Sequence, residues 1–277
     1  MPSGPLSDAE PSARAEDLHQ AGVWLARHGM ADAPPTPLLA TRLAVRRRAR
    51  RADRLVLAAL IIAAALAQAY DRLSTSAFGG YEPHRPMPLL LLTALTAGLL
   101  LVQALLGRWV RRVDRRAGHA LRRRAAHPVQ PGWRAVLGRP YALFASATFA
   151  GAAALALSAL TVQDSTVRYA AFVLLVGLFG VGAGVALQLR DLLARPVVAE
   201  DETSLTADVI MRVEDARELA TPTVLWALPV VLLFGSAPGW WNGASLVFVV
   251  AGLVTCAAIQ ARTPPGAAVA RRAMSAR

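Results

Sequence analysis

The chain has 277 residues, of which 55% are hydrophobic and only 17% are charged, and its formal net charge is +12. A soluble domain carries roughly 25% charged residues, and it does not contain uninterrupted apolar runs of membrane-spanning length. The composition therefore excludes an ordinary soluble domain and predicts an all-α integral membrane protein.

All 30 basic residues are arginine, and the chain contains no lysine. A Walker A phosphate loop, a kinase ATP site and a Schiff-base cofactor each need a lysine amine, so we expect none of them in this chain. The arginine bias is typical of a high-GC bacterium. The single cysteine, Cys256, lies in an apolar run and cannot form an intrachain disulfide.

Residues 1–54 are predicted to form a cytoplasmic N-terminal segment in three parts. A short amphipathic helix is expected over Ser12–His28, with Gly29 just beyond its end, followed by a stiff proline-rich linker at 33–37. A polybasic helix then enters the membrane. Its arginines are expected to contact anionic lipid or to fix the topology: Arg46, Arg47, Arg48, Arg50, Arg51 and Arg54.

Residues 55–260 are predicted to form a membrane domain of six transmembrane helices arranged as three hairpins. The apolar segments are Leu55–Leu73, Met87–Leu106, Tyr141–Val162, Tyr169–Leu189, Pro222–Phe234 and Trp240–Gln260. The fifth is short for a bilayer that needs about 20 helical residues, and it contains Pro229. It either crosses as a kinked or tilted helix or forms a re-entrant segment.

Arginine placement indicates the orientation of a six-span chain. The N-terminal segment, the connections at 107–140 and 190–221 and the tail at 261–277 together hold 27 arginines, whereas the other side receives Arg72, Arg85 and Arg168. Cytoplasmic loops are enriched in arginine. We therefore expect a multi-pass protein of the bacterial inner membrane with both termini in the cytoplasm.

The two long cytoplasmic connections carry opposite charges. The connection at 107–140 has ten arginines and one acid, Asp114, whereas the connection at 190–221 has four arginines and eight acids. A helix is predicted over Leu205–Leu219 in the acidic connection, and we expect it to pack on the arginine-rich connection. Its candidate partner contacts are Glu214, Asp215 and Glu218.

The middle of each predicted span lacks Asp, Glu, Arg and His. Coupled carriers usually place ionisable residues there, so an ion-coupled transporter is disfavoured. Helix packing is expected at Gly180, Gly182 and Gly184 in the fourth span, with a matching small-residue surface around Gly151 in the third. The contact is expected within the chain, although a contact between subunits is an alternative.

We find no motif for catalysis, for a cofactor or for a metal, since the histidines are scattered and no GxSxG or HExxH pattern occurs. The arginines lack the aromatic or recognition-helix pattern of a nucleic-acid-binding protein. We therefore expect a non-enzymatic protein with the lipid bilayer as one partner.

Two functions remain open. The first is a permease-like or accessory subunit of a transport system, powered by a separate ATPase, because six-span hairpin proteins are common in transport. The second is a membrane-anchored scaffold or regulator that presents the acidic helix to a cytoplasmic regulator. The substrate, the signal and the oligomeric state are not indicated by the sequence.

Overall fold

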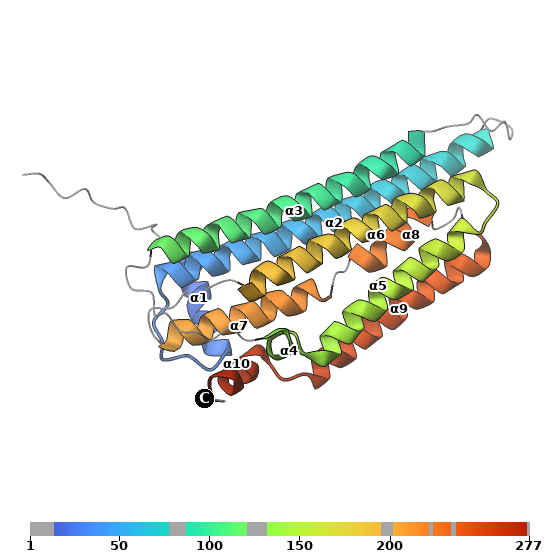
Figure 1. Cartoon of the computed structure of the whole chain (residues 1–277). Coiled ribbons are helices and arrows are strands. Elements are labelled where there is room, and N and C mark those ends of the chain that lie inside the picture. Colours follow the sequence, from blue (N-terminus) through green and yellow to red (C-terminus); the bar gives the residue numbers. More distant parts are fainter. Residues whose placement is uncertain are drawn as a thin grey trace, which may run out of the picture.

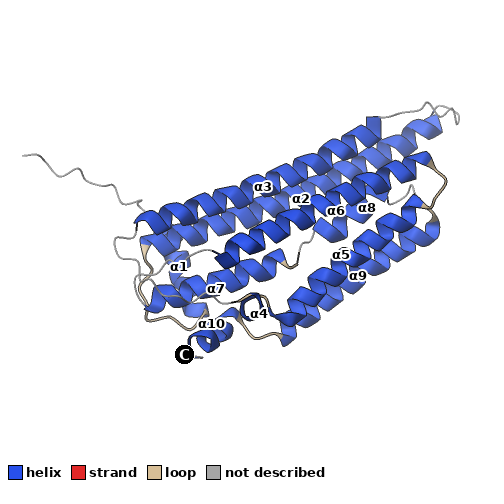
Figure 2. Cartoon of the chain, in the orientation of Figure 1, coloured by secondary structure: helices blue, strands red, loops and turns tan. Residues whose placement is uncertain are grey.

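The computed structural model describes residues 14–77, 87–120, 132–194, 202–221, 224–233 and 237–275. Every regular element in these residues is an α-helix (Figure 2). The helices are α1 (Ala15–Arg27), α2 (Pro37–Ala77), α3 (Met87–Ala120), α4 (Trp133–Val136), α5 (Gly138–Leu160), α6 (Ser165–Ala194), α7 (Glu202–Leu219), α8 (Val224–Leu233), α9 (Gly239–Arg262) and α10 (Gly266–Ser275). Glu200 and Asp201 of the acidic connection lie outside the described residues.

Four helical stretches in the described residues are long and apolar enough to cross a membrane: Thr93–Arg116, Gly138–Leu160, Ser165–Ala194 and Gly239–Arg262. They correspond to the second, third, fourth and sixth predicted spans. The first predicted span lies within α2, and α8 covers only ten residues of the fifth. The four apolar helices indicate a membrane-embedded helical protein.

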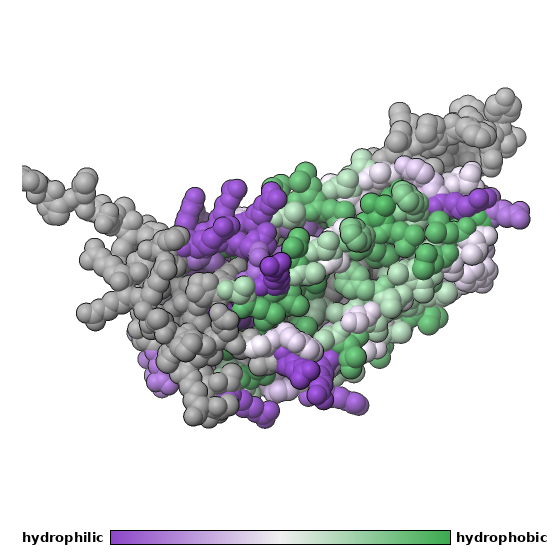
Figure 3. All heavy atoms as spheres, viewed as in Figure 1, coloured by the Kyte–Doolittle hydropathy of each residue, from purple (hydrophilic) through white to green (hydrophobic). Residues whose placement is uncertain are grey.

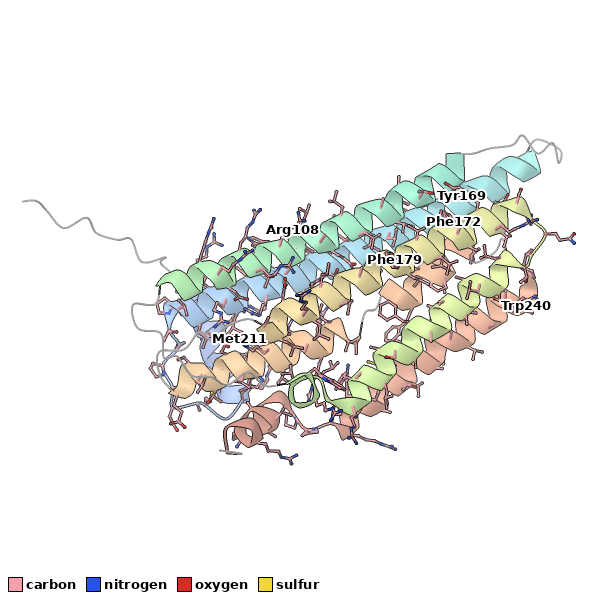
Figure 4. All side chains as sticks on the ribbon, viewed as in Figure 1. Arg108, Tyr169, Phe172, Phe179, Met211 and Trp240 are labelled. Atoms are coloured by element: carbon pink, nitrogen blue, oxygen red, sulfur yellow. The ribbon has the colours of Figure 1, made fainter. Side chains whose placement is uncertain are left out.

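The interior of the membrane region combines alanines with large apolar side chains such as Leu174 and Trp241, and its outside also carries large apolar side chains. Ala152, Ala156 and Ala159 of α5 are fully buried in a core shared with α6, whereas Phe172 and Phe179 on α6 are 60% and 78% exposed. Figure 4 labels both phenylalanines along α6. Small residues let helices approach closely, and exposed apolar side chains suit a lipid surround. Hydrophobic residues accordingly cover the middle of the face that Figure 3 shows.

Helices α2 and α3 lie side by side and are longer than a bilayer requires (Figure 1). They have 41 and 34 residues. At 1.5 Å per residue they measure roughly 60 and 50 Å, compared with a hydrocarbon core of about 30 Å. Their polar ends therefore extend beyond the apolar band.

We use the name "cap" for the helical body at this polar end, which consists of α1, residues 37–54 of α2, residues 108–116 of α3, α4, α7 and α10. Helix α7 lies at its centre. Ala207 and Met211 of α7 pack on α1 and α2, Val209 and Ile210 pack on α10, and Val213 contacts residues of α4, α5 and α6. Because neighbours surround it, α7 is buried on most sides despite its charged sequence.

Helix α1 ends in a Schellman motif that turns the chain towards α2. Gly29 has φ +76°, its N–H donates to the carbonyl of Ala26, and the Met30 N–H donates to the carbonyl of Leu25. Leu25 is 1% exposed, and Met30 packs on the cluster that contains it. The left-handed conformation favours glycine at this position. The motif places α1 against the rest of the cap.

Candidate functional site

The cap contains a buried cluster of arginine and aspartate side chains from three helices. We call it the arginine–aspartate cluster, and its members are Arg42 and Arg46 of α2, Asp114 of α3, and Asp208, Arg212 and Asp215 of α7. These three arginines and three aspartates balance in charge. The cluster joins segments that lie more than 160 positions apart in the sequence.

Asp114 connects the two arginines of α2. Its Oδ1 accepts from Arg42 Nε at 3.1 Å and from Arg46 Nη1 at 3.1 Å, and its Oδ2 accepts from Arg46 Nη2 at 2.9 Å. The contact with Arg46 is therefore bidentate, the geometry in which a guanidinium and a carboxylate bind most specifically. Asp114 fastens the polar ends of α2 and α3 to each other.

The aspartates of α7 bind the same two arginines from the other side. Arg42 Nη2 donates to Asp208 Oδ1 at 2.6 Å, and Arg46 Nε donates to Asp215 Oδ2 at 2.9 Å. Arg212 lies one turn from Asp208 and donates from Nε to Asp208 Oδ2 at 2.9 Å. Each arginine of α2 thus bridges an aspartate of α3 and an aspartate of α7.

Because its side chains are largely buried, this cluster is expected to stabilise the packing of α2, α3 and α7 on one another. Arg42, Asp114 and Asp208 are 3%, 2% and 1% exposed. Burial alone would lower the pKa of Arg46, but Asp215 and Asp114 hold that pKa above its ordinary value, so the side chain stays charged. Removing one partner of a buried ion pair typically costs about 3–5 kcal/mol, because the other charge remains buried.

The edge of the cluster is more open. Arg50 of α2 donates to Asp215 Oδ1 at 3.4 Å and also binds Glu218, whose side chain is 48% exposed. Burial raises the pKa of Glu218, and the nearby Asp215 carboxylate adds to the increase, whereas the Arg50 cation opposes it. Ionised Glu218 is therefore less favourable in the folded protein than its ion pair alone suggests.

We expect Glu218→Gln to keep or slightly raise the melting temperature at pH 7. A carboxyl whose folded pKa is raised contributes stability below its unfolded pKa and loses it as the pH rises through the folded value. The neutral amide avoids that loss. Melting curves of wild type and variant between pH 4 and 8 should differ most at the upper end and converge on acidification. A variant that melts below wild type at pH 7 would refute this role.

A second set of contacts holds α1 against the rest of the cap. His28 Nδ1 lies 2.8 Å from the Trp24 carbonyl, and His28 Nε2 lies 3.0 Å from Glu214 Oε1 of α7. Asp17, near the start of α1, accepts from Arg47 at 3.0 Å and from Arg48 at 3.4 Å. An imidazolium, which donates from both ring nitrogens, would satisfy both contacts of His28. Helix α1 is thus bound at both ends.

We expect His28→Ala to loosen α1 without unfolding the membrane helices. The variant loses the link to Glu214, and a hydrogen bond to a charged group contributes about 1.5–3 kcal/mol. Hydrogen exchange of the α1 amides should accelerate by about tenfold or more. His19→Ala is the matched control, because His19 is exposed on the same helix. Equal exchange in both variants would show that the link does not hold α1.

The residues proposed from the sequence as lipid and partner contacts lie mostly within the chain's own ion pairs. Of the six arginines expected at the lipid, Arg46, Arg47, Arg48 and Arg50 bind Asp114, Asp17, Asp215 or Glu218, whereas Arg51 and Arg54 are exposed. The acids of α7 thus bind mainly α2, whereas we expected the arginine-rich connection. The two connections do meet elsewhere: Arg111 lies 3.7 Å from Asp191, and Val136 and Leu137 pack in one apolar cluster with Val213 and Ala216 of α7.

The glycines of α6 face two different helices. A Cβ on Gly180 would lie 2.9 Å from Leu100 of α3, and a Cβ on Gly182 would lie 3.4 Å from Phe149 of α5. Gly184 has nothing within 4 Å of that position, and Gly151 faces Phe248 of α9. Among these three glycines of α6, Gly180 is therefore the one with the closest neighbour, and that neighbour belongs to α3. Gly151 of α5 faces α9, so it does not form the contact with the glycines of α6 that we expected.

Arg42, Asp208 and Arg212 were not among the site residues predicted from the sequence, and Asp114 was noted only as the single acid among ten arginines. The spacing contained a signal. Arg42, Arg46 and Arg50 recur every four residues on α2, and Asp208 and Asp215 are seven apart on α7, so each set forms one stripe. Complementary stripes on two helices indicate a pairing that total charge does not reveal.

A separate polar feature lies among the membrane helices. Trp226 of α8 is 6% exposed, and its Nε1–H has no hydrogen-bond acceptor among the described residues. Its ring meets Phe144 of α5 edge-on at 6.0 Å between centroids, and Nε1 would lie 2.6 Å from a Cβ on Gly252 of α9. A buried donor without an acceptor is costly and therefore unusual.

Within the described residues, no group of three or more His, Cys, Asp or Glu side chains is placed to hold a metal ion. Comparison with known protein families, curated proteins and solved structures finds no match to this chain.

Proposed function

We propose that the protein is a six-span, permease-like or accessory subunit of a transport system that a separate protein powers. The observation that carries the proposal is α8, a ten-residue helix with Pro229 inside it that packs against α2, α5, α6 and α9. Transporters typically build their binding sites from short or interrupted helices enclosed by continuous ones.

The packing of the cap supports six crossings with both termini in the cytoplasm. The start of α2, the end of α3, α7 and α10 all contribute to the cap, and these segments hold most of the arginines. Helix α9 begins at Gly239, at the end of the molecule away from the cap, where Figure 4 labels the next residue, Trp240. The chain between Thr221 and Gly239 therefore has to cover the distance that α9 covers, which favours a crossing at α8.

The chemistry around α8 restricts the substrate. Trp226 provides one buried donor, and the Thr148 hydroxyl, one turn along α5 from Phe144, already donates to the Phe144 carbonyl. The apolar parts of α3, α5, α6 and α9 lack Asp, Glu, Arg and His. A neutral or amphipathic molecule with a hydrogen-bond acceptor fits such a path better than an ion does.

The energy source is expected on another chain, because this one has no lysine for a phosphate-binding loop.

The alternative function, a scaffold that presents the acidic helix, has less support, because Asp208 and Asp215 are bound within the cap. A scaffold would need a different surface, such as the exposed arginines 108, 112, 115 and 116 of α3.

Purification in mild detergent, with identification of stoichiometric partners and an ATPase assay, tests the proposal. We expect a nucleotide-hydrolysing partner whose activity responds to a neutral solute and whose response is reduced by Trp226→Phe, which removes the indole donor and keeps an aromatic ring. A regulatory partner without nucleotide hydrolysis, whose signalling is lost on deletion of 204–219, would support the scaffold function instead.

A further inference from the structure

A shallow groove lies beside the end of the apolar part of α6. Its volume is about 590 Å³, and it is lined by Trp133, Ala186, Leu189, Arg190, Leu193 and Ala194. The groove does not overlap the arginine–aspartate cluster or Trp226.

The lining divides into an apolar floor and a cationic rim. Leu189 and Leu193 form part of the contact between α6 and the α4–α5 region, and Ala186 is exposed. Among the described residues that line the groove, Arg190 is the charged one, and it directly follows the predicted fourth span. The Arg134 guanidinium lies 5.4 Å from the centre of the Trp133 ring, which places a second cation beside the groove.

The position corresponds to the boundary between hydrocarbon and headgroups. The apolar part of α6 ends at Leu189, and tryptophan side chains such as Trp133 are typical of membrane interfaces. Leu187, which precedes Arg190 by three residues, is 61% exposed, as expected for a side chain that faces lipid. A ligand in the groove would therefore lie between the acyl chains of the bilayer on one side and the Arg190 side chain on the other.

We propose that this groove binds one anionic phospholipid, with an acyl chain on Leu189 and Leu193 and the phosphate at Arg190 and Arg134. Basic pockets between membrane helices at the cytoplasmic boundary favour anionic headgroups. A neutral phospholipid would gain the apolar contact but would place its own cation near the arginines. A free phosphate would gain only the charge contact.

Native mass spectrometry of the full-length protein in detergent, titrated with phosphatidylglycerol or phosphatidylcholine of the same acyl chains, tests the proposal. We expect saturable binding of phosphatidylglycerol that Arg190→Gln weakens by about tenfold or more. Arg108→Gln is the matched control, because Arg108 is an exposed arginine outside the groove, on α3 (Figure 4). It should change the affinity by less than about twofold.

A second variant tests the apolar half of the site without changing any charge. Ala186→Trp should fill the groove and reduce phosphatidylglycerol binding, while melting temperatures near the wild-type value confirm that both groove variants are folded. Three results would overturn the proposal: equal affinity for both lipids, equal loss in Arg190→Gln and Arg108→Gln, or full competition by soluble glycerol phosphate.

Discussion

Asp114→Asn is expected to destabilise the cap more than any other single isosteric change in the described residues. Asp114 is 2% exposed and neutralises Arg42 and Arg46 together. The amide keeps the size of the side chain but removes its charge, so both guanidinium groups remain buried with one carboxylate fewer. We expect a loss of about 3 kcal/mol or more. For a protein of this size that corresponds to a decrease in melting temperature of roughly 10 °C.

Thermal unfolding in detergent measures this effect. Asp32→Asn is the matched control, because Asp32 is exposed, and it should melt within about 2 °C of wild type. The double variant Arg46→Met with Asp114→Leu should lose less than the sum of its single variants, since no uncompensated charge from the pair remains. Additive losses, or an Asp114→Asn protein as stable as Asp32→Asn, would contradict the role given to the cluster.

Gly252→Val is expected to produce the second large effect, this time within the membrane region. A Cβ at position 252 would lie 2.6 Å from Trp226 Nε1 and 3.0 Å from its Cε2, which is closer than atoms can pack. The indole is 6% exposed, so we expect that it has little free space into which it could move away from the new side chain. Overpacking of this kind typically costs about 1–3 kcal/mol, so we expect a melting temperature lower by several degrees.

Gly243→Val provides the matched control for this experiment. Gly243 lies on the same helix, and nothing is within 4 Å of the position that its Cβ would take. The same β-branched side chain should therefore have little effect there. Trp226→Leu combined with Gly252→Val should recover part of the lost stability, because the smaller side chain leaves the space that valine needs. Equal melting temperatures for the two glycine variants would exclude the contact.

The sequence was sufficient to predict the membrane class, because long apolar runs leave few other structures. Three of the four candidate spans, in α5, α6 and α9, match predicted segments to within a few residues, and the N-terminal and acidic helices occur as α1 and α7. The number of crossings was harder to predict. Pro229 divides a short apolar segment, and hydropathy alone does not distinguish a short crossing from a re-entrant helix.

The interior of the cap could not be predicted from charge totals. Summing charges over the connections at 107–140 and 190–221 treated each as a uniform field, whereas the face of each helix decides which side chains meet. Asp114 faces α2 although its neighbours in sequence are mostly arginines. Helix α10 was not predicted, because Gly266–Ser275 is short and its contacts with α7 depend on the three-dimensional arrangement.

Single-cysteine accessibility tests most directly the central claim that the cap and both termini share one side of the membrane while α8 crosses it. In a Cys256→Ala background, His19→Cys, Glu202→Cys, Gly239→Cys and Arg271→Cys each place a thiol at an exposed position. We expect a membrane-impermeant maleimide added to intact cells to label Gly239→Cys alone, and to label the other three only after permeabilisation. Protection of Gly239→Cys together with Glu202→Cys would show that α8 does not cross and would remove the basis of the proposed function.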